Sequence, residues 1–174
     1  MLTETGLLAR LVSTGPAIWL PYKLMMLIAL LKETGDYATI KKPPQGGFGW
    51  YLKALHLLLD ALAYGEVPQD SEILPKFEVL LHAMAESPLP VRTRLLLMRE
   101  YERIGQFGRV RDQFLAALEK SPKNPKLLNF GIAFFERLSG ESDGTLAAAD
   151  LPRSEMEVII SKLVADKTAL KGVT

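Results

Sequence analysis

The two histidines of this sequence each stand one helical turn from a carboxylate, in the pairs His56 with Asp60 and Glu78 with His82. A spacing of four residues places both members of a pair on one side of a helix, where imidazole and carboxylate groups can bind a metal ion or activate water. Apolar residues occupy the other side of both segments, which leaves the pairs on polar, solvated faces. A metal-binding or hydrolytic enzyme that uses these four residues is therefore the alternative hypothesis, and no cofactor or metal is expected.

Other catalytic chemistry has less support. The chain contains no cysteine, which excludes disulfides, thiolate metal sites and a cysteine nucleophile. The glycine-rich stretch PPQGGFGW, residues 43–50, has no following Gly-Lys-Ser/Thr and no preceding strand pattern, so a phosphate-binding loop is not expected. It is instead predicted to join two helices, with contact to a partner as an alternative. We expect a protein that is not an enzyme.

The charges of the sequence nearly balance overall and are uneven in one region only. Lys and Arg number 21 against 20 Asp and Glu, so the net charge of +1 gives no reason to expect nucleic acid or an anionic membrane as a partner. Between Arg92 and Lys126, however, nine basic residues face four acidic ones. Arg92, Arg99 and Arg103 share one side of a predicted helix, where their guanidinium groups could bind the carboxylates of an acidic peptide.

Apolar residues recur at helical spacing along nearly the whole chain, which predicts an all-α protein. A length of 174 residues fits a single domain over residues 1–174. A turn is expected at Thr34-Gly35-Asp36, and flexible loops are expected near 38–49 and 139–152. The predicted helices span residues 2–13, 20–34, 48–64, 72–86, 91–104, 107–120, 125–138 and 153–167.

The apolar region over residues 7–31 raises the question of a membrane span. Arg10 and Lys23 interrupt it, Pro16 and Pro21 break it, and the longest clean run, 24–31, is far shorter than the roughly 20 residues that a span requires. The region also lacks the charge pattern and cleavage site of a signal peptide. We therefore expect two buried helices and a protein of the cytoplasm.

Residues 91–122 match the spacing of the tetratricopeptide repeat, a helix–turn–helix unit of about 34 residues. Leu97 and Tyr101 lie on one face of the first helix, and Gly105 permits a tight turn. The second helix then turns its aromatic and alanine positions toward the first. Ser87-Pro88 precedes Ser121-Pro122 by one such period. The sequence thus predicts a tetratricopeptide-like (TPR-like), right-handed superhelical stack of about four antiparallel helix hairpins.

Five segments together resemble a family of uncharacterised bacterial proteins with TPR-like helices. They are KLMMLIALLKETGDY, WYLKALHLLLDAL, PVRTRLLLMREYERIGQF, FGIAFFERL and LPRSEMEVIISKL. The resemblance implies the fold and the bacterial cytoplasm, and it brings no catalytic or ligand residues. In TPR proteins the first helix of a repeat lines the concave surface, which would make Arg92, Arg99 and Arg103 part of a partner-binding surface.

The segment over residues 24–31 is apolar on nearly all sides. Leu24, Leu27, Ile28 and Leu31 form one face, and Met25, Met26 and Leu30 extend the apolar character around the helix. A helix of this kind must be enclosed on most sides. The following helices could enclose it within one chain, and otherwise a homodimer through these N-terminal helices is expected.

Overall fold

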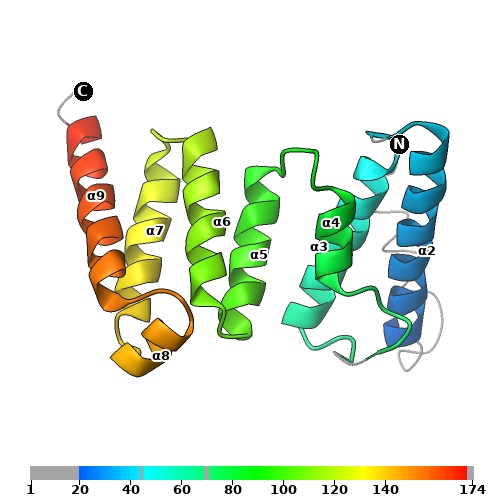
Figure 1. The fold of residues 1–174 in the computed structure, drawn as a ribbon, viewed down its shortest axis with the longest axis horizontal. Helices are drawn as coiled ribbons and strands as arrows, with labels where there is room; N and C mark the ends of the chain where they lie inside the picture. Colours follow the sequence, from blue (N-terminus) through cyan, green and yellow to red (C-terminus); the bar gives the residue numbers. More distant parts are fainter. Residues whose placement is uncertain (1–19, 44, 69–70, 172–174) are drawn as a thin grey trace. The chain divides into compact units, whose positions relative to one another are not determined.

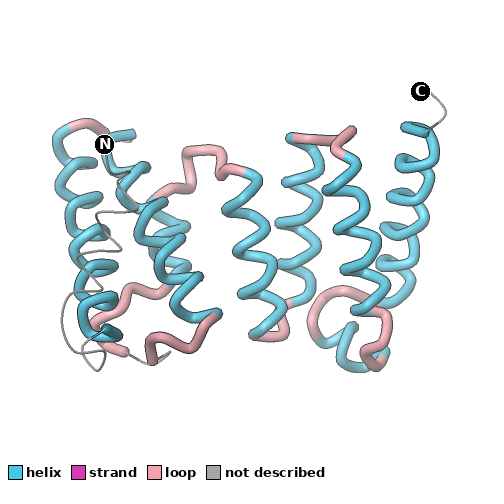
Figure 2. Tube along the Cα trace, turned by 180° about the vertical axis from the view of Figure 1, so that it is seen from behind, coloured by secondary structure: helices cyan, strands magenta, loops and turns pink. Residues whose placement is uncertain are grey.

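The computed structural model describes residues 20–43, 45–68 and 71–171, and every regular element in these ranges is a helix (Figures 1 and 2). The predicted all-α class is confirmed. The predicted helix over 2–13 lies outside the described residues. The chain divides between Leu89 and Pro90 into two compact units, each with its own core.

The first unit begins with α2 (Leu20–Lys41), which packs against α3 (Phe48–Ala63). The expected turn at Thr34-Gly35-Asp36 is wrong, because α2 continues without a break to Lys41. Gly35 has a different purpose inside the helix. A Cβ at this position would lie 2.6 Å from a ring carbon of Tyr51 on α3, so glycine lets the tyrosine ring pack against the α2 backbone.

The loop expected near 38–49 is largely helical. After α2 ends, the 3-10 helix η2 (Gln45–Gly47) leads directly into α3. A Cβ on Gly46 would overlap the carbonyl oxygen of Ala38, and one on Gly47 would lie 2.6 Å from the carbonyl oxygen of Gly35. The two glycines are therefore required because the backbone of η2 lies directly against α2.

The remaining helix of the first unit is short. The sequence predicts a helix over 72–86, whereas α4 spans only Phe77–Ala83. Its first turn follows Pro75, and residues after Met84 form turns. Phe77 and Leu80 are buried, and α4 packs on α3.

The second unit starts with the predicted hairpin, α5 (Val91–Arg103) and α6 (Phe107–Lys120), which pack side by side. Gly105 occupies the connection with a φ of 73°, a left-handed conformation that favours glycine. The residues that carry the repeat spacing are buried in this hairpin: Leu97, Tyr101, Phe107, Phe114 and Ala117. The helix–turn–helix prediction over 91–120 is confirmed.

The hairpin is followed by α7 (Pro125–Leu138), which pairs with α9 (Arg153–Lys171). Asn124 caps α7 by accepting hydrogen bonds from the N–H groups of Lys126 and Leu127. The buried ring of Phe114 meets Phe135 edge to face, with the centroids 5.3 Å apart. Gly131 leaves room for Phe114, since a Cβ there would overlap the ring.

The predicted flexible loop over 139–152 instead contains a further helix, α8 (Asp143–Ala148). Ser142 caps α8 through its hydroxyl, which accepts the N–H of Thr145 at 3.1 Å. Leu146 and Leu151 are fully buried, and Arg153 donates to the carbonyl oxygens of Ser139 and Glu141, both at 2.8 Å. Because apolar residues anchor both sides of the segment, it packs into the core of the second unit.

Candidate partner-binding surface

Arg92, Arg99 and Arg103 lie along one side of α5, and all three are exposed. The opposite side of the helix holds the buried Leu97 and Tyr101. The intervals of seven and four residues predicted this shared side, and the helix bounds show that all three arginines belong to one uninterrupted helix.

Arg103 already has a partner inside the unit. Its Nε and Nη2 donate to the two carboxylate oxygens of Glu100 at 2.9 and 2.6 Å, and Glu100 is only 4% exposed. The hydrogen bond with Glu100 raises the pKa of the Arg103 guanidinium above its usual value. A ligand that drew Arg103 away would leave a buried carboxylate without its cation, which is costly. Arg103 is therefore held in a fixed position by Glu100, which also offsets its charge. The net positive charge of a ligand site would have to come from the other arginines of this side.

An ion pair extends this surface from α5 to α7. Arg137 on α7 binds Glu102 on α5, and this hydrogen bond raises the pKa of the Arg137 guanidinium. The guanidinium also lies 5.0 Å from the centre of the Phe134 ring. Through these contacts the C-terminal turns of α5 and α7 lie next to each other in the same unit.

Beside this ion pair α7 exposes an aromatic ring. Phe130 stands two helical turns before Arg137, is 42% exposed, and packs against Phe134 with the centroids 5.9 Å apart. The sequence did not single out Phe130, because its spacing alone does not distinguish it from the buried aromatics of α7. We call the set Arg92, Arg99, Glu102, Arg103, Phe130 and Arg137 the α5–α7 surface. It combines four guanidinium groups and one carboxylate with an exposed ring.

Part of the basic excess in this region serves the packing of the unit instead. Arg94 donates to Gln113 on α6 at 3.1 Å. Arg111 donates to the carboxylate of Glu155 on α9 at 2.9 and 3.0 Å and to the carbonyl oxygen of Asp150 at 3.1 Å. These two arginines join elements of the second unit, so they are not available to a ligand.

The structure does not bring together a metal site from the two histidine pairs. His56 and Asp60 are half-buried on α3, whereas Glu78 and His82 are exposed on α4. Within residues 20–43, 45–68 and 71–171, no group of three or more His, Asp and Glu residues is arranged to hold a metal ion. The spacing within each pair is helical as predicted, but the two pairs lack a common centre.

A pocket of about 450 Å³ lies in the second unit, between the start of α6 and the end of α8. Its charged lining consists of Arg109, Asp112 and Asp150, which carry opposite charges. Two of its lining residues are already hydrogen-bonded to each other, since the N–H of Gly108 donates to the carbonyl oxygen of Ala149 at 2.7 Å. With mixed charges and this backbone donor already used, the pocket does not match an anion or a cation in particular.

Comparison with known proteins identifies a matching family. The model of one family, described as a family of unknown function (DUF6483), matches residues 24–167. None of the curated proteins and none of the solved structures matches the chain significantly. In the part of the chain that the structure describes, no helix has both the length and the apolar character to cross a bilayer.

Proposed function

Since the chain belongs to the family of unknown function DUF6483, its role has to be inferred from its own surfaces, and we propose that it is a non-enzymatic protein-interaction scaffold. In this proposal its helix hairpins are TPR-like, α5 lines the concave side of the stack, and the α5–α7 surface binds an acidic peptide or helix of a partner protein. The cytoplasmic location and bacterial origin that the resemblance implies form part of the same proposal.

The observation that carries the proposal is that the second unit exposes the Phe130 ring on α7, one ring away from the Arg137 guanidinium, together with Arg92 and Arg99 on α5. Arginine can bind carboxylates through two parallel hydrogen bonds, and an exposed aromatic ring offers apolar contact area. Both features are common at the centres of protein interfaces. The expected ligand therefore carries Asp or Glu residues around one apolar side chain, which would lie against Phe130.

Binding to synthetic peptides tests this directly. The probe is a set of fluorescent peptides of about 15 residues in which acidic residues flank one Leu or Phe, measured by anisotropy at low and high salt. Arg99→Glu should weaken binding about tenfold or more, since the charge reversal replaces attraction by repulsion, and Phe130→Ala should weaken it several-fold. Lys162→Glu, an equal charge change at an exposed position of α9, should have no effect.

The control decides between specific and general charge effects. If Arg99→Glu and Lys162→Glu weaken binding equally, the peptides respond to net charge and the α5–α7 surface is not the site. If full-length chains with Arg99→Glu bind every acidic peptide as strongly as the unmodified protein does, the proposal is wrong. Circular dichroism of each variant checks that its helix content is unchanged.

A further inference from the structure

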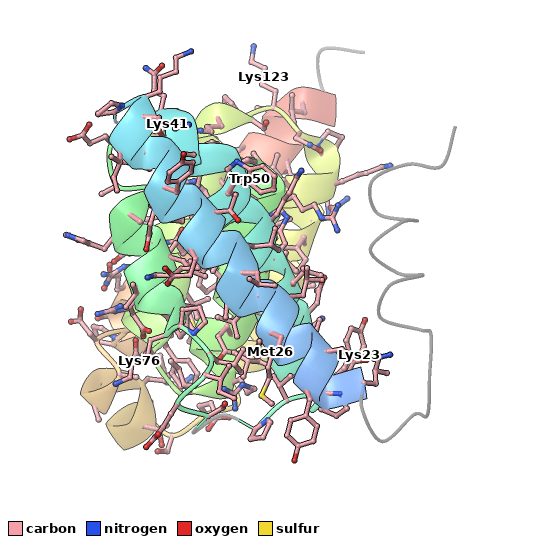
Figure 3. All side chains as sticks on the ribbon, turned by 90° about the vertical axis from the view of Figure 1, so that its right-hand side faces the viewer. Lys23, Met26, Lys41, Trp50, Lys76 and Lys123 are labelled. Atoms are coloured by element: carbon pink, nitrogen blue, oxygen red, sulfur yellow. The ribbon has the colours of Figure 1, made fainter. Side chains whose placement is uncertain are left out.

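The side of α2 opposite its buried residues carries a row of large apolar side chains, each more than half exposed. They are Tyr22 at 57%, Met26 at 52%, Leu30 at 58%, Tyr37 at 58% and Ile40 at 78%. The intervals of four, four, seven and three residues place them on one face of the helix. Figure 3 looks directly onto this helix, with Met26 labelled on it and Lys23 and Lys41 toward its two ends. We call this row the α2 stripe.

The α2 stripe is more apolar than the surface of a lone unit requires. The other side of α2 already buries Leu24, Ile28 and Leu31. A helix that is apolar on two opposite sides is normally covered on both, and a long exposed apolar row is typical of an interaction site. The sequence placed Leu24, Leu27, Ile28 and Leu31 on one face and Met25, Met26 and Leu30 around the rest of the helix, with self-association covering what the following helices leave open. The structure buries Leu24, Met25, Ile28 and Leu31 and leaves Met26 and Leu30 exposed, in line with Tyr22, Tyr37 and Ile40.

The charges along α2 favour a protein partner over a lipid surface. Glu33 lies on the face of the stripe, and the Nζ of Lys32 binds Glu33 at 2.9 Å and Asp36 at 2.7 Å. Insertion into a bilayer would remove this ion-paired group from water at high cost. In a protein contact Glu33 can keep its ion pair with Lys32, whose side chain lies beside the stripe and stays open to water.

We propose that the α2 stripe binds the α2 stripe of a second copy of this chain, with the two helices antiparallel. A centre between Leu31 and Lys32, half a residue from the middle of the stripe at Leu31, sets the register of this pair. An antiparallel pair centred there places Met26 opposite Tyr37 of the second copy and Tyr22 opposite Lys41. A twofold axis makes each contact twice, so the stripe is complementary to itself. Methionine beside an aromatic ring and lysine over an aromatic ring are both favourable contacts.

A parallel pair lacks this complementarity. Each residue would then lie opposite its own copy, which places Lys23 near Lys23, Glu33 near Glu33 and Lys41 near Lys41. Like charges at such short range are unfavourable. In the antiparallel pair Lys23 and Lys41 lie opposite Ile40 and Tyr22, more than about 25 Å along the helix from their own copies. Glu33 lies opposite Leu30, about one turn from its own copy, and its charge is offset by the ion pair with Lys32.

The size of the contact suits a dimer. From Tyr22 to Ile40 the stripe extends about 27 Å along the helix at the usual rise per residue. Covering it on both copies would bury on the order of 1,000 Å², near the lower end for specific protein interfaces. The inference concerns the first unit and does not depend on peptide binding by the second.

The oligomeric state of the full chain gives the first test. Light scattering after size-exclusion chromatography should give twice the chain mass of 19.3 kDa. Leu30→Lys should raise the dissociation constant of the dimer at least about tenfold, because a charge replaces an apolar group at the centre of the contact. Val158→Lys is the matched control, since Val158 is 67% exposed on α9 and its replacement should leave the dimer intact. A monomer at high concentration would overturn the proposal.

Disulfide cross-linking tests the antiparallel orientation of the two α2 helices. Because the chain contains no cysteine, only the introduced residues can form a disulfide. The double variant Met26→Cys, Tyr37→Cys should form a covalent dimer on mild oxidation. In either single variant the two like cysteines would be separated by about 16 Å along the antiparallel pair, beyond the reach of a disulfide. Covalent dimers from the single variants would show a parallel pair and contradict the proposal, as would the absence of cross-linking in the double variant.

Discussion

The two units of the molecule are stabilised by different means. In residues 20–89 the close approach of helices depends on glycine. Gly35 leaves room for the ring of Tyr51, and Gly47 lets the backbone of η2 lie against α2. In residues 90–171 arginine side chains connect the elements, as Arg111 does for α6 and α9 and Arg153 does for α8 and α9. The candidate surfaces differ as well: the first unit exposes the apolar row of α2, and the second exposes the arginines of α5 and the Phe130 ring of α7.

This difference explains why the two candidate surfaces require different partners. The α2 stripe consists of apolar side chains, so contact with it is favoured by the removal of apolar area from water. The α5–α7 surface consists of guanidinium groups and one ring, so contact with it is sensitive to salt and to the charge of the ligand. One chain can use both surfaces because each belongs to a separate core.

The largest expected effect tests whether the two cores unfold separately. Phe114→Ala should destabilise the second unit by about 3–5 kcal/mol, since a fully buried ring leaves a cavity. Hydrogen exchange should then show lost protection in residues 90–171 and retained protection in residues 20–89. The control Phe130→Ala, at a ring that is 42% exposed, should cost less than about 1 kcal/mol. Simultaneous loss of protection in both units would indicate one cooperative domain over residues 1–174, as the length predicts.

The second test concerns the glycines of the first unit. Gly47→Ala should cost about 1–3 kcal/mol, because the new methyl group would meet the carbonyl oxygen of Gly35, which the backbone holds in place. Gly49→Ala should instead stabilise by up to about 1 kcal/mol, since nothing lies within 4 Å of its Cβ position and alanine favours the helix. Urea denaturation measures both. If both variants raise the free energy of unfolding, the flexibility of glycine in the unfolded chain, and not close packing in the folded one, decides the stability at these two positions.

A smaller effect is expected for the arginine contacts of the second unit. Arg111→Gln should lower the free energy of unfolding by about 1–2 kcal/mol. The loss is smaller than for a fully buried ion pair because Glu155 is 41% exposed. Raising the salt from about 0.05 M to about 1 M should reduce this difference. The exposed Arg92→Gln is the control and should leave the unfolding midpoint unchanged. An effect of Arg111→Gln that does not depend on salt would mean that packing of the side chain, and not its charge, stabilises the unit.

The smallest effect concerns pH. Burial raises the pKa of Tyr51 above its usual 10.0, and its hydroxyl donates to Asp36 at 2.9 Å. The folded state therefore favours the neutral tyrosine, so this contribution is fully present below about pH 10 and is lost as the pH rises further. Tyr51→Phe should cost about 1 kcal/mol at neutral pH and should make stability above pH 10 less dependent on pH. Tyr64→Phe, at a ring that is 72% exposed, is the control and should cost less stability at neutral pH. A pH profile of Tyr51→Phe identical to that of the unmodified protein would contradict the prediction.

Local chemistry was predictable wherever short-range spacing decides the outcome. The α5–α6 hairpin follows from apolar and small residues at helical intervals around Gly105, and the start of α7 follows from Asn124 before Pro125. Arg92, Arg99 and Arg103 were assigned correctly to one side of a helix for the same reason. Such features depend only on residues within a few turns of each other.

Features that depend on distant residues were missed. Gly35 was expected to end a helix, but the ring of Tyr51, sixteen positions later, makes glycine necessary within α2. The segment over 139–152 was expected to be a flexible loop, but Leu146 and Leu151 are buried in the core of the second unit. The burial of Glu100 and the exposure of Phe130 also depend on which helices lie nearby.

The sequence by itself determined that this chain is helical, where most of its helices lie, and that no thiol chemistry is available to it. The tertiary structure alone decided which of the apolar and basic residues remain on the surface. The physical reason is that helical periodicity gives the side of a helix on which a residue lies. Exposure and ion pairing, in contrast, depend on the neighbouring helix, which is set by contacts between residues far apart in the chain.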